Sequence, residues 1–435
     1  MKTKMADSRA WKGVLVVAVT LLFLGNSARV AAPARALGES TVYEFQGNGM
    51  DGQWPVAGLI SDPVGNLYGT TLFGGDCVSP CLGYGSVYEL SPKMGGGWSE
   101  KLIYSLQGTP DGDAPFGNLV MDSSGDIFGT TLEGGPENDG TVFELSPANG
   151  GGWNETVLNS SKMDGPVSLI IDSSGNLYGC DDGANEGYFG DIFELSPQSG
   201  AGWIQKILYS FEGKSTKVGS MPSGNLVLDS AGNLYGATIA GGPRGDGVAF
   251  ELSPQATGMW NKTVLHNFLG MPIDGKYPQG GLIAGGVNVF YGTTSNGGTA
   301  GWGVVFELQR NQQGVWNESI LYNFQSGADG KRPYSQLVID SAGNLYGTTA
   351  SGGTGPCQEA SFGRGCGTVF ELVPSSNSWT EKILQDFQPK DGGRLLAPLL
   401  FGPSGSLFGA AEFNGTGDCL TGDTPGCGTV FEITQ

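Results

Sequence analysis

The chain has 435 residues, of which 42 are acidic and 22 are Lys or Arg, giving a formal net charge of −20. This acidic balance argues against a nucleic-acid-binding protein, because affinity for phosphate backbones comes largely from Lys and Arg. Glycine is abundant, at 77 residues, but the apolar residues recur at regular intervals, which a disordered chain lacks.

Residues 1–36 have the pattern of a secretory signal peptide. The basic residues that open it are Lys2, Lys4, Arg9 and Lys12. An apolar run over 14–24 follows, shorter than the roughly 20 residues that a bilayer span requires. Ala34-Arg35-Ala36 supplies an A-x-A cleavage site. We therefore predict an exported protein, extracellular or periplasmic, with no membrane span after signal removal; an uncleaved anchor is the alternative.

A short motif repeats seven times along the rest of the chain. "GNLYG" occurs at 65–69, 175–179, 232–236 and 343–347, with looser copies at 125–129, 288–292 and 405–409. Each copy is followed by a segment like "TVFELSP" at 141–147. A third segment begins with Trp in six units, as at 203–211, and a fourth leads from Pro into the next copy, as at 115–125.

Each unit therefore predicts four short strands, because apolar runs of four to eight residues alternate with Gly, Pro, Asn and Asp. Seven four-stranded units predict an all-β fold, a seven-bladed β-propeller over 41–435. The last unit stops after its third strand, whereas 41–46 resembles the end of a fourth strand. We expect 41–46 to complete blade seven and close the ring.

The repeated wording "GNLYGTT … GTVFELSP … W … LYSF … DG" resembles the GloVer-type bacterial tandem repeat of secreted "choice-of-anchor" proteins. The resemblance covers nearly all of 41–435. It implies an exported, β-propeller-like protein and brings no established activity with it.

Several repeated residues have a structural interpretation. The glycine in the middle of each second strand, such as Gly69, is expected to let an aromatic ring of a neighbouring blade approach the backbone. The glutamate of each third strand, such as Glu89, is expected to find donors among second-strand threonines or backbone amides. The Trp that opens a fourth strand, such as Trp98, is expected to be a packing residue.

Six of the seven cysteines fall in pairs within the loop between the second and third strands. The pairs are Cys77 and Cys81, Cys357 and Cys366, and Cys419 and Cys427. In an exported chain such pairs predict local disulfides. Zinc is the alternative, although the spacings are irregular and His266 is the only histidine. Cys180 is left over and is predicted to be a buried free thiol.

The loops between second and third strands, and those from each fourth strand to the next unit, vary in sequence, whereas the other turns are nearly constant. In a propeller these variable loops share one face, here called the variable face, which we expect to hold the binding site. The longest of them, at 76–84, 354–366 and 416–427, belong to blades one, six and seven. We expect them to form a disulfide-braced wall.

Aromatic residues on the variable face are candidate binding residues. Tyr84, Phe189 and Trp302 stand just before the glycine that opens the third strand. Their rings could stack on a sugar or on a partner side chain.

Acidic residues of blade three are a second candidate. Asp181 and Asp182, with Asn185 and Glu186, form the densest oxygen cluster of the chain. They are a Ca²⁺ candidate without EF-hand spacing, and a solvated acidic loop is the plainer interpretation. The aspartates of six "DG" pairs, such as Asp111, are expected to add negative charge to the same face.

The sequence offers no catalytic constellation, and His266 occupies a place where other units have Tyr. We therefore predict a secreted, monomeric binding or interaction module with an unknown extracytoplasmic ligand, carbohydrate or cell-envelope partner, and no further cofactor. The alternatives are a carboxylate-based polysaccharide glycosidase or lyase, and a structural surface protein.

Overall fold

The computed structural model describes residues 38–47, 51–76, 83–159, 163, 165–183, 189–200, 202–211, 219–359, 362–376, 378–417, 419–421 and 424–434. The chain divides into two units, Met1–Ala36 and Leu37–Gln435, and the elements given below belong to the second. Within the described ranges, no helix is long and apolar enough to cross a membrane.

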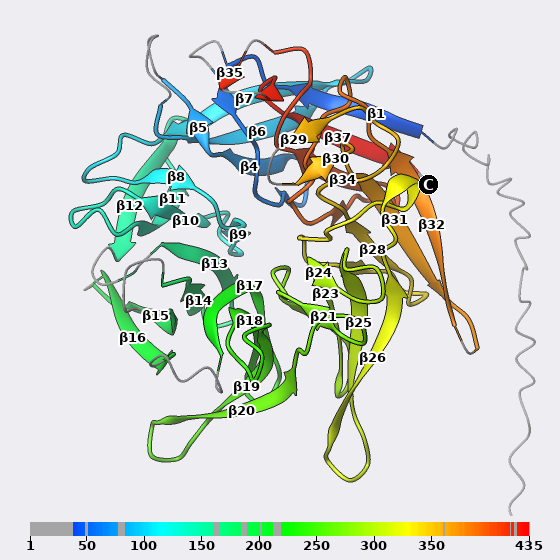
Figure 1. Ribbon diagram of the computed structural model, residues 1–435. Helices are drawn as coiled ribbons and strands as arrows, with labels where there is room; N and C mark the ends of the chain where they lie inside the picture. The colour runs from blue at the N-terminus through cyan, green and yellow to red at the C-terminus, as the bar shows by residue number, and fades with distance from the viewer. Residues whose placement is uncertain are drawn as a thin grey trace, which may run out of the picture. The chain divides into compact units, whose positions relative to one another are not determined.

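Seven antiparallel sheets, six four-stranded and one five-stranded, surround a common centre (Figure 1). Blade one consists of β3 (Ile60–Ser61), β4 (Leu67–Thr71), β6 (Ser86–Pro92) and β7 (Trp98–Ser105). Blade two consists of β9 (Val120–Met121), β10 (Ile127–Glu133), β11 (Thr141–Pro147) and β12 (Trp153–Asn159), with β8 (Asp113–Pro115) also paired to β10. Blade three consists of β13 (Pro166–Ile171), β14 (Leu177–Asp181), β15 (Asp191–Gln198) and β16 (Gly202–Ser210).

The remaining blades follow the same order. Blade four consists of β17 (Ser220–Leu228), β18 (Leu234–Ala240), β19 (Val248–Pro254) and β20 (Trp260–Asn267). Blade five consists of β22 (Leu282–Gly286), β23 (Val289–Thr294), β25 (Val304–Arg310) and β26 (Trp316–Asn323). Blade six consists of β27 (Val338–Ile339), β28 (Leu345–Thr348), β31 (Thr368–Pro374) and β32 (Trp379–Asp386). Blade seven consists of β33 (Leu400–Phe401), β34 (Leu407–Ala411), β37 (Thr429–Thr434) and β1 (Gly38–Glu44).

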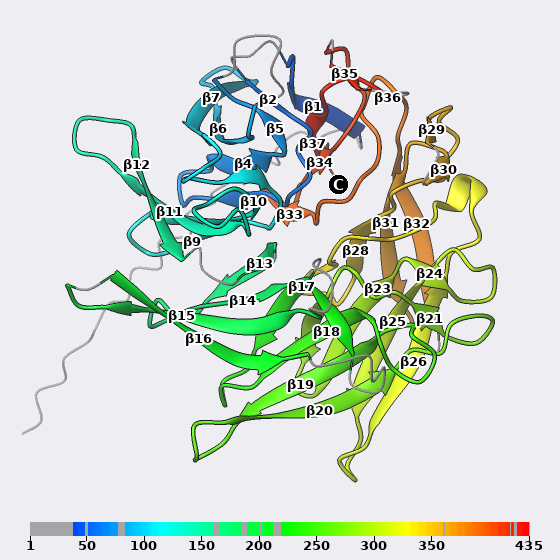
Figure 2. The ribbon, with the colours of Figure 1, turned by 60° about the vertical axis from the view of Figure 1, so that its left-hand side comes forward.

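Short two-stranded ribbons lie in the connecting loops (Figure 2). They pair β2 (Gly52–Gln53) with β5 (Phe73–Gly74), β21 (Gly275–Lys276) with β24 (Asn296–Gly297), β29 (Gln358–Glu359) with β30 (Gly363–Arg364), and β35 (Leu420–Thr421) with β36 (Thr424–Pro425). A 3-10 helix, η1 (Gly327–Asp329), lies in the loop between blades five and six.

The N-terminal strand closes the ring. β1 pairs antiparallel with β37, from Gly38 opposite Thr434 to Glu44 opposite Thr429, and both ribbon views show the two strands side by side (Figures 1 and 2). The predicted seven-bladed propeller with its last blade completed by the N-terminal strand is confirmed. The strand begins at Gly38, earlier than the expected residue 41.

The glycine in the middle of each second strand makes room for an aromatic ring. A Cβ built on Gly129 would lie 2.4 Å from Cζ of Phe143, and one built on Gly409 would lie 2.3 Å from Cζ of Phe431. Gly129 pairs with Phe143 across the same sheet. The expectation that the ring comes from a neighbouring blade is therefore wrong, because directly opposite residues of adjacent strands are the ones whose side chains meet.

Neighbouring blades are joined by edge-to-face aromatic pairs. Trp153 of β12 lies 6.3 Å from Tyr68 of β4, centroid to centroid. Trp98 of β7 lies 5.6 Å from Phe408 of β34, across the point where the ring closes. Such pairs contribute about 0.5–1.5 kcal/mol beyond the area they bury, which agrees with the packing role expected for these tryptophans.

The third-strand glutamates have other partners than expected. Ser91 Oγ donates to Glu89 Oε1 at 2.8 Å, and Ser146 Oγ does the same for Glu144 at 2.9 Å. In blade six, Tyr346 Oη donates to Glu371 Oε1 at 3.0 Å. The donors are thus the serine two residues further on and a second-strand tyrosine, since these share the glutamate's face of the sheet.

We expect Gly129→Ala to lower the free energy of unfolding by about 1–3 kcal/mol, because the new methyl group would overlap the Phe143 ring. Urea denaturation measures the change. In the double variant Gly129→Ala/Phe143→Leu the shorter side chain should reduce the penalty of the alanine. A full penalty in both backgrounds would show that the ring is not the cause.

Candidate functional site

A residue with a positive φ, between 57° and 66°, lies in the loop before each blade or at the start of the blade's first strands. These residues are Trp54, Ala114, Gly165, Met221, Tyr277, Arg332 and Arg394. Six of the seven are not glycine, although the left-handed region costs a residue with a Cβ roughly 1–2 kcal/mol. Residues held in strained backbone conformations of this kind cluster at active sites and ligand-binding positions. We therefore take these side chains as candidate ligand contacts.

The backbone N–H of each positive-φ residue donates to a carbonyl of the preceding blade, at 2.8–3.2 Å. The donor and acceptor pairs are Trp54 and Cys427, Ala114 and Tyr84, Gly165 and Asp139, Met221 and Phe189, Tyr277 and Asp246, Arg332 and Trp302, and Arg394 and Cys366. Every acceptor is the variable residue just before the third-strand glycine. Two sets of variable positions thus lie next to each other around the variable face.

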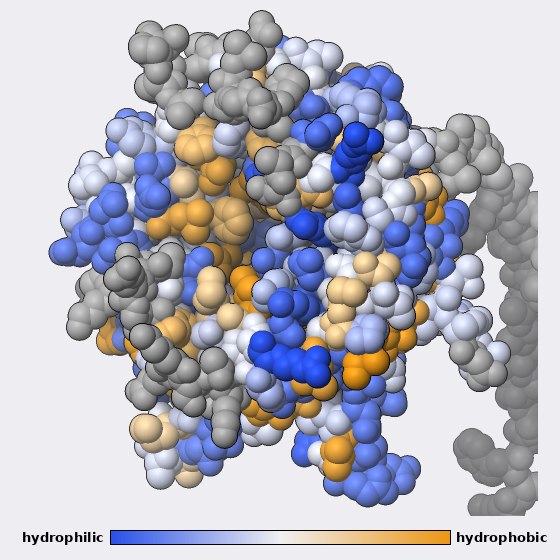
Figure 3. All heavy atoms as spheres, in the orientation of Figure 1, coloured by the Kyte–Doolittle hydropathy of each residue, from blue (hydrophilic) through white to orange (hydrophobic). Residues whose placement is uncertain are grey.

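A central cavity of about 270 Å³ opens among the inner ends of the blades. Its lining includes the residue two positions after each positive-φ residue: Val56, Phe116, Val167, Ser223, Gln279, Tyr334 and Leu396. Figure 3 shows a hollow near the centre of this face, with hydrophobic surface towards β8 and β10 and strongly hydrophilic surface towards β31 and β34.

Amide side chains supply much of the polar lining of the cavity. Asn225 Nδ2 donates to Gln336 Oε1 at 3.2 Å, and Gln336 Nε2 donates to the Leu282 carbonyl at 2.8 Å. Gln279 Oε1 is buried and accepts no hydrogen bond from the protein. A buried acceptor without a partner is costly, so this oxygen is available to a ligand hydroxyl or amide.

Aromatic rings and guanidinium groups alternate on the side of blades six, seven and one. The Trp54 and Phe413 rings are 5.0 Å apart, and Arg394 Cζ lies 4.1 Å from the Phe413 ring. Arg394 Cζ also lies 5.0 Å from the Phe362 ring, which Arg332 Cζ approaches to 5.7 Å. We call these five residues the aromatic–cation row. Cation–π contacts of this kind orient flat groups against one another.

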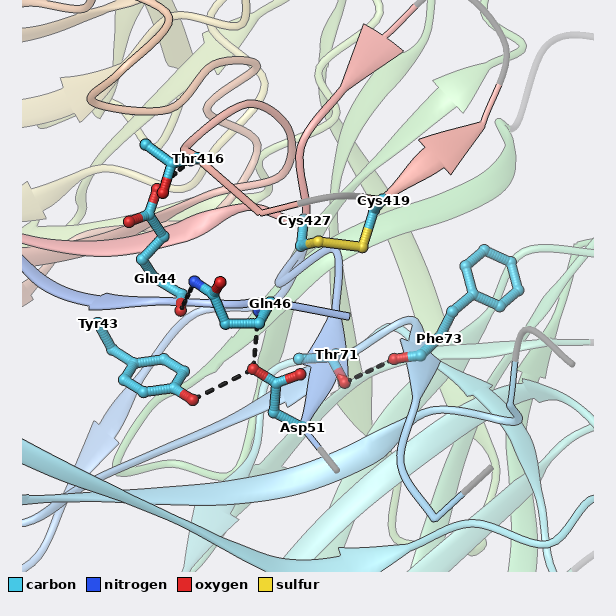
Figure 4. The surroundings of a disulfide bond; sticks show 9 residues. All are labelled: Tyr43, Glu44, Gln46, Asp51, Thr71, Phe73, Thr416, Cys419 and Cys427. Carbon is cyan, nitrogen blue, oxygen red and sulfur yellow. Dashed lines mark hydrogen bonds between the residues drawn. A yellow bond between two sulfur atoms is a disulfide. The ribbon is translucent and has the colours of Figure 1, made fainter. Parts of the chain in front are cut away.

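The aromatic–cation row is supported by disulfides. Cys357–Cys366 encloses Phe362, and Cys419–Cys427 presents the carbonyl that holds Trp54. Figure 4 shows the second disulfide beside the closing strand, where Gln46 N–H donates to Asp51 at 2.8 Å. These two predicted disulfides are confirmed, whereas the wall expected from the three long loops stays a prediction, because much of the blade-one loop lies outside the described residues. The predicted Cys77–Cys81 pair lies outside the described residues.

A buried cation continues the row towards blade five. Lys331 is only 7% exposed, and its Nζ lies 4.9 Å from the centroid of the Trp302 ring. Burial, with the nearby Arg332 guanidinium, lowers the pKa of Lys331. Arg394, in contrast, is ion-paired to Glu412. Lys331 is therefore the cation that a bound anion would stabilise most.

The three predicted aromatic residues do not converge. Tyr84 is 48% exposed between blades one and two, Phe189 lies between blades three and four, and Trp302 between blades five and six. None of them lines the central cavity. Sequence reasoning missed the positive-φ residues beside them, although one signal was present, since a variable residue precedes Pro in "WP", "AP", "MP", "YP" and "RP".

The two predicted acidic residues have different roles. Asp181 is fully buried, and its Oδ1 accepts the backbone N–H of Asp191 at 2.9 Å. In blade two, Thr131 Oγ1 accepts the equivalent hydrogen bond from the N–H of Thr141. Asp181 therefore replaces a structural threonine of other blades. Asp182 lines the central cavity. Asn185 and Glu186, which would complete a Ca²⁺ cluster, lie outside the described residues.

Cys180, next to Asp181, is a free thiol and fully buried, as expected. Burial raises the pKa of this thiol to about 12. The group is thus protonated and unreactive under ordinary conditions.

Four of the six "DG" aspartates are buried and do not add exposed charge to the variable face, contrary to expectation, whereas Asp329 is partly exposed and Asp164 lies outside the described residues. Asp51, Asp111, Asp274 and Asp391 are all less than 8% exposed. Asp111 Oδ2 accepts from Tyr104 Oη at 3.1 Å and from the Gln107 N–H at 2.9 Å. They are buried because the loop folds back onto its own blade to satisfy the carboxylate.

Three of the "DG" aspartates, Asp51, Asp111 and Asp329, each interact with a glutamate on the next blade. Burial, and to a smaller extent the neighbouring carboxylate of Asp111, raises the pKa of Glu155 to about 7. Burial and Asp51 do the same for Glu100, and burial and Asp329 for Glu381. Like charges held this close favour the protonated form of one partner.

The chain belongs to the family described as the Gloeobacter/Verrucomicrobia repeat, which matches residues 34–242 and 222–435. This confirms the resemblance that the repeated wording indicated. No protein with a curated function matches the chain by sequence.

Solved structures with similar folds are distant in sequence. The extracellular domain of a putative one-component system from B. thetaiotaomicron matches at 7% identity and a TM-score of 0.53, over 91% of this chain and 40% of that one. The WD40 β-propeller domain of Doa1 matches at 9% identity and a TM-score of 0.51, over 91% and 97%. A gluconolactonase from Xanthomonas campestris matches at 11% identity, over 93% and 92%, but its TM-score of 0.43 carries no weight. The first two matches support the β-propeller fold alone.

The paired carboxyl groups predict a pH-dependent stability. The pKa values of Glu100, Glu155 and Glu381 rise from 4.5 to about 7 on folding. A group whose pKa is higher in the folded state contributes its full share of stability below its unfolded-state pKa. This contribution is lost as the pH rises through the folded-state pKa. We expect the free energy of unfolding to fall between about pH 5 and about pH 8.

The triple variant Glu100→Gln/Glu155→Gln/Glu381→Gln should flatten this decline, because the amides do not titrate. Urea denaturation at each pH measures the slope. Equal slopes in the wild type and the variant would refute the assignment.

Proposed function

We propose that this member of the Gloeobacter/Verrucomicrobia repeat family is an exported binding module that holds a glycan on its variable face. The observation that carries the proposal is the set of large side chains, Trp54, Met221, Tyr277, Arg332 and Arg394, at positions where the backbone favours glycine. A scaffold without a ligand would keep glycine there, as it does at Gly165.

The chemistry of this face suits a carbohydrate. Aromatic rings such as Trp54 and Trp302 offer flat apolar surfaces to the C–H groups of a sugar. The amides of the central cavity, with the unpartnered Gln279 Oε1, suit its hydroxyl groups. The buried Lys331, which lies beside the Trp302 ring, favours a sugar that also carries a carboxylate.

Two features support export. The disulfides Cys357–Cys366 and Cys419–Cys427 form and persist in oxidising compartments. Residues 1–36 carry the pattern of a signal peptide.

Hydrolysis of the glycan is the rival activity. Glycosidases of the usual kind use two carboxyl groups about 5–9.5 Å apart across the scissile bond. Among the described residues that line the central cavity, Asp182 supplies the one carboxylate. Binding without turnover is therefore the better supported function, and a purely structural surface protein is the remaining alternative.

A glycan array probed with the mature protein should show binding, with uronic-acid polymers above neutral ones. Trp302→Ala and Arg332→Ala should each weaken the affinity about tenfold or more, equivalent to about 1.4 kcal/mol. Met94→Ala, which truncates a fully exposed side chain in the turn between β6 and β7, is the matched control and should change nothing.

Affinity that is indifferent to Trp302→Ala and Arg332→Ala would place the ligand elsewhere. Release of reducing sugars by the wild-type protein, abolished by Asp182→Asn, would replace the proposal with the rival activity. The absence of binding to every arrayed glycan would favour the structural alternative.

A further inference from the structure

A histidine and two carboxylates meet between blades four and five, away from the residues that line the central cavity. His266 lies on β20, Asp274 in the loop that follows it, and Glu318 on β26 of the next blade. Glu318 therefore comes from a different blade than the other two side chains. Their potential ligand atoms all lie within 4.8 Å of one another.

The three side chains are held in place by the surrounding structure. His266 Nε2 is 3.1 Å from Asp274 Oδ2, and the His266 ring packs edge-on against Phe268 with centroids 4.8 Å apart. Asp274 is only 4% exposed, and the N–H groups of Leu269 and Gly275 fix its two oxygens at 2.8 Å and 2.6 Å. The side-chain atoms of His266 and Asp274 that could bind a metal are therefore held in place.

One oxygen of this cluster has no hydrogen-bond partner, as is also the case for the equivalent glutamates Glu100, Glu155 and Glu381 of other blades. Glu318 Oε1 is buried and makes no hydrogen bond. Two carboxylates so close together repel each other when both are ionised, and only one imidazole is at hand to offset them. A cation between them would remove the repulsion and occupy the unpartnered oxygen.

The chain contains its own comparison sites. Tyr43, Asp51 and Glu100 occupy the equivalent places between blades seven and one, as do Tyr104, Asp111 and Glu155 between blades one and two, and Tyr322, Asp329 and Glu381 between blades five and six. In these the phenol donates a hydrogen bond to the aspartate and offers no good metal ligand. His266 alone replaces the phenol with an imidazole, which has a lone pair for a metal.

We propose that His266, Asp274 and Glu318 bind one divalent transition-metal ion, Zn²⁺ in the first instance, as a cross-link between blades four and five. A tetrahedral Zn²⁺ ion takes nitrogen and oxygen ligands at about 2.0–2.2 Å, which places the ligand atoms a little over about 3 Å apart. His266 Nε2 and Asp274 Oδ2, 3.1 Å apart, already meet this requirement, and the remaining separations, at most 4.8 Å, must contract on binding. Water would complete the coordination.

The test uses the mature protein, stripped with EDTA and titrated with Zn²⁺, with metal content measured after dialysis. The wild type should retain one Zn²⁺ per chain, and its melting temperature should rise on addition of the metal. Co²⁺ in the same site should give the visible absorption bands of a tetrahedral ion. Glycan binding should not depend on the metal, which separates this test from that of the proposed function.

His266→Tyr is the matched variant, because it recreates the arrangement of Tyr104, Asp111 and Glu155 found elsewhere in the chain. It should fold, melt near the temperature of the metal-free wild type, and retain no Zn²⁺. Glu318→Gln should also lose the metal, since it removes one ligand without altering the shape. Substoichiometric Zn²⁺ in the wild type, or equal retention by His266→Tyr, would overturn the proposal.

Discussion

A single backbone hydrogen bond, repeated between successive blades, organises the variable face. The N–H of each positive-φ residue donates to the carbonyl that ends the variable loop of the preceding blade, in all seven places. The bond fixes where the next blade begins, so the residue two positions further on always reaches the central cavity. Because the bond uses only backbone atoms, the side chains at both of its ends remain free to differ from blade to blade.

The stability of the ring comes from a different set of contacts. Trp153 against Tyr68 and Trp98 against Phe408 join the outermost strand of one blade to the second strand of its neighbour. Mid-strand glycines such as Gly129 leave room for the rings of the third strand to pack against the sheet. Packing on the blades therefore does not depend on the loops. The variable face can carry positive-φ arginines and buried cations because the scaffold beneath it over-determines the backbone.

Much of the fold was predictable from the sequence, because the propeller repeats its glycine and aromatic pattern seven times. The closing role of the N-terminal strand and the disulfides of blades six and seven followed from the same register. The surroundings of individual side chains could not be predicted from the sequence pattern. A residue before Pro is expected to be extended, so "YP" and "RP" could mark Tyr277 and Arg332 as variable positions but could not indicate their positive φ. Likewise, the burial of Asp111 depends on the fold of its loop, which composition does not determine.

The central claim is that the positive-φ side chains are kept for binding rather than for stability. The most direct measurement compares the free energy of unfolding and the glycan affinity of the variant Met221→Gly/Tyr277→Gly/Arg332→Gly with those of the wild type. Glycine relieves the backbone and removes the side chains. The account predicts unchanged or higher stability with the affinity lost. A large loss of stability with the affinity retained would contradict it.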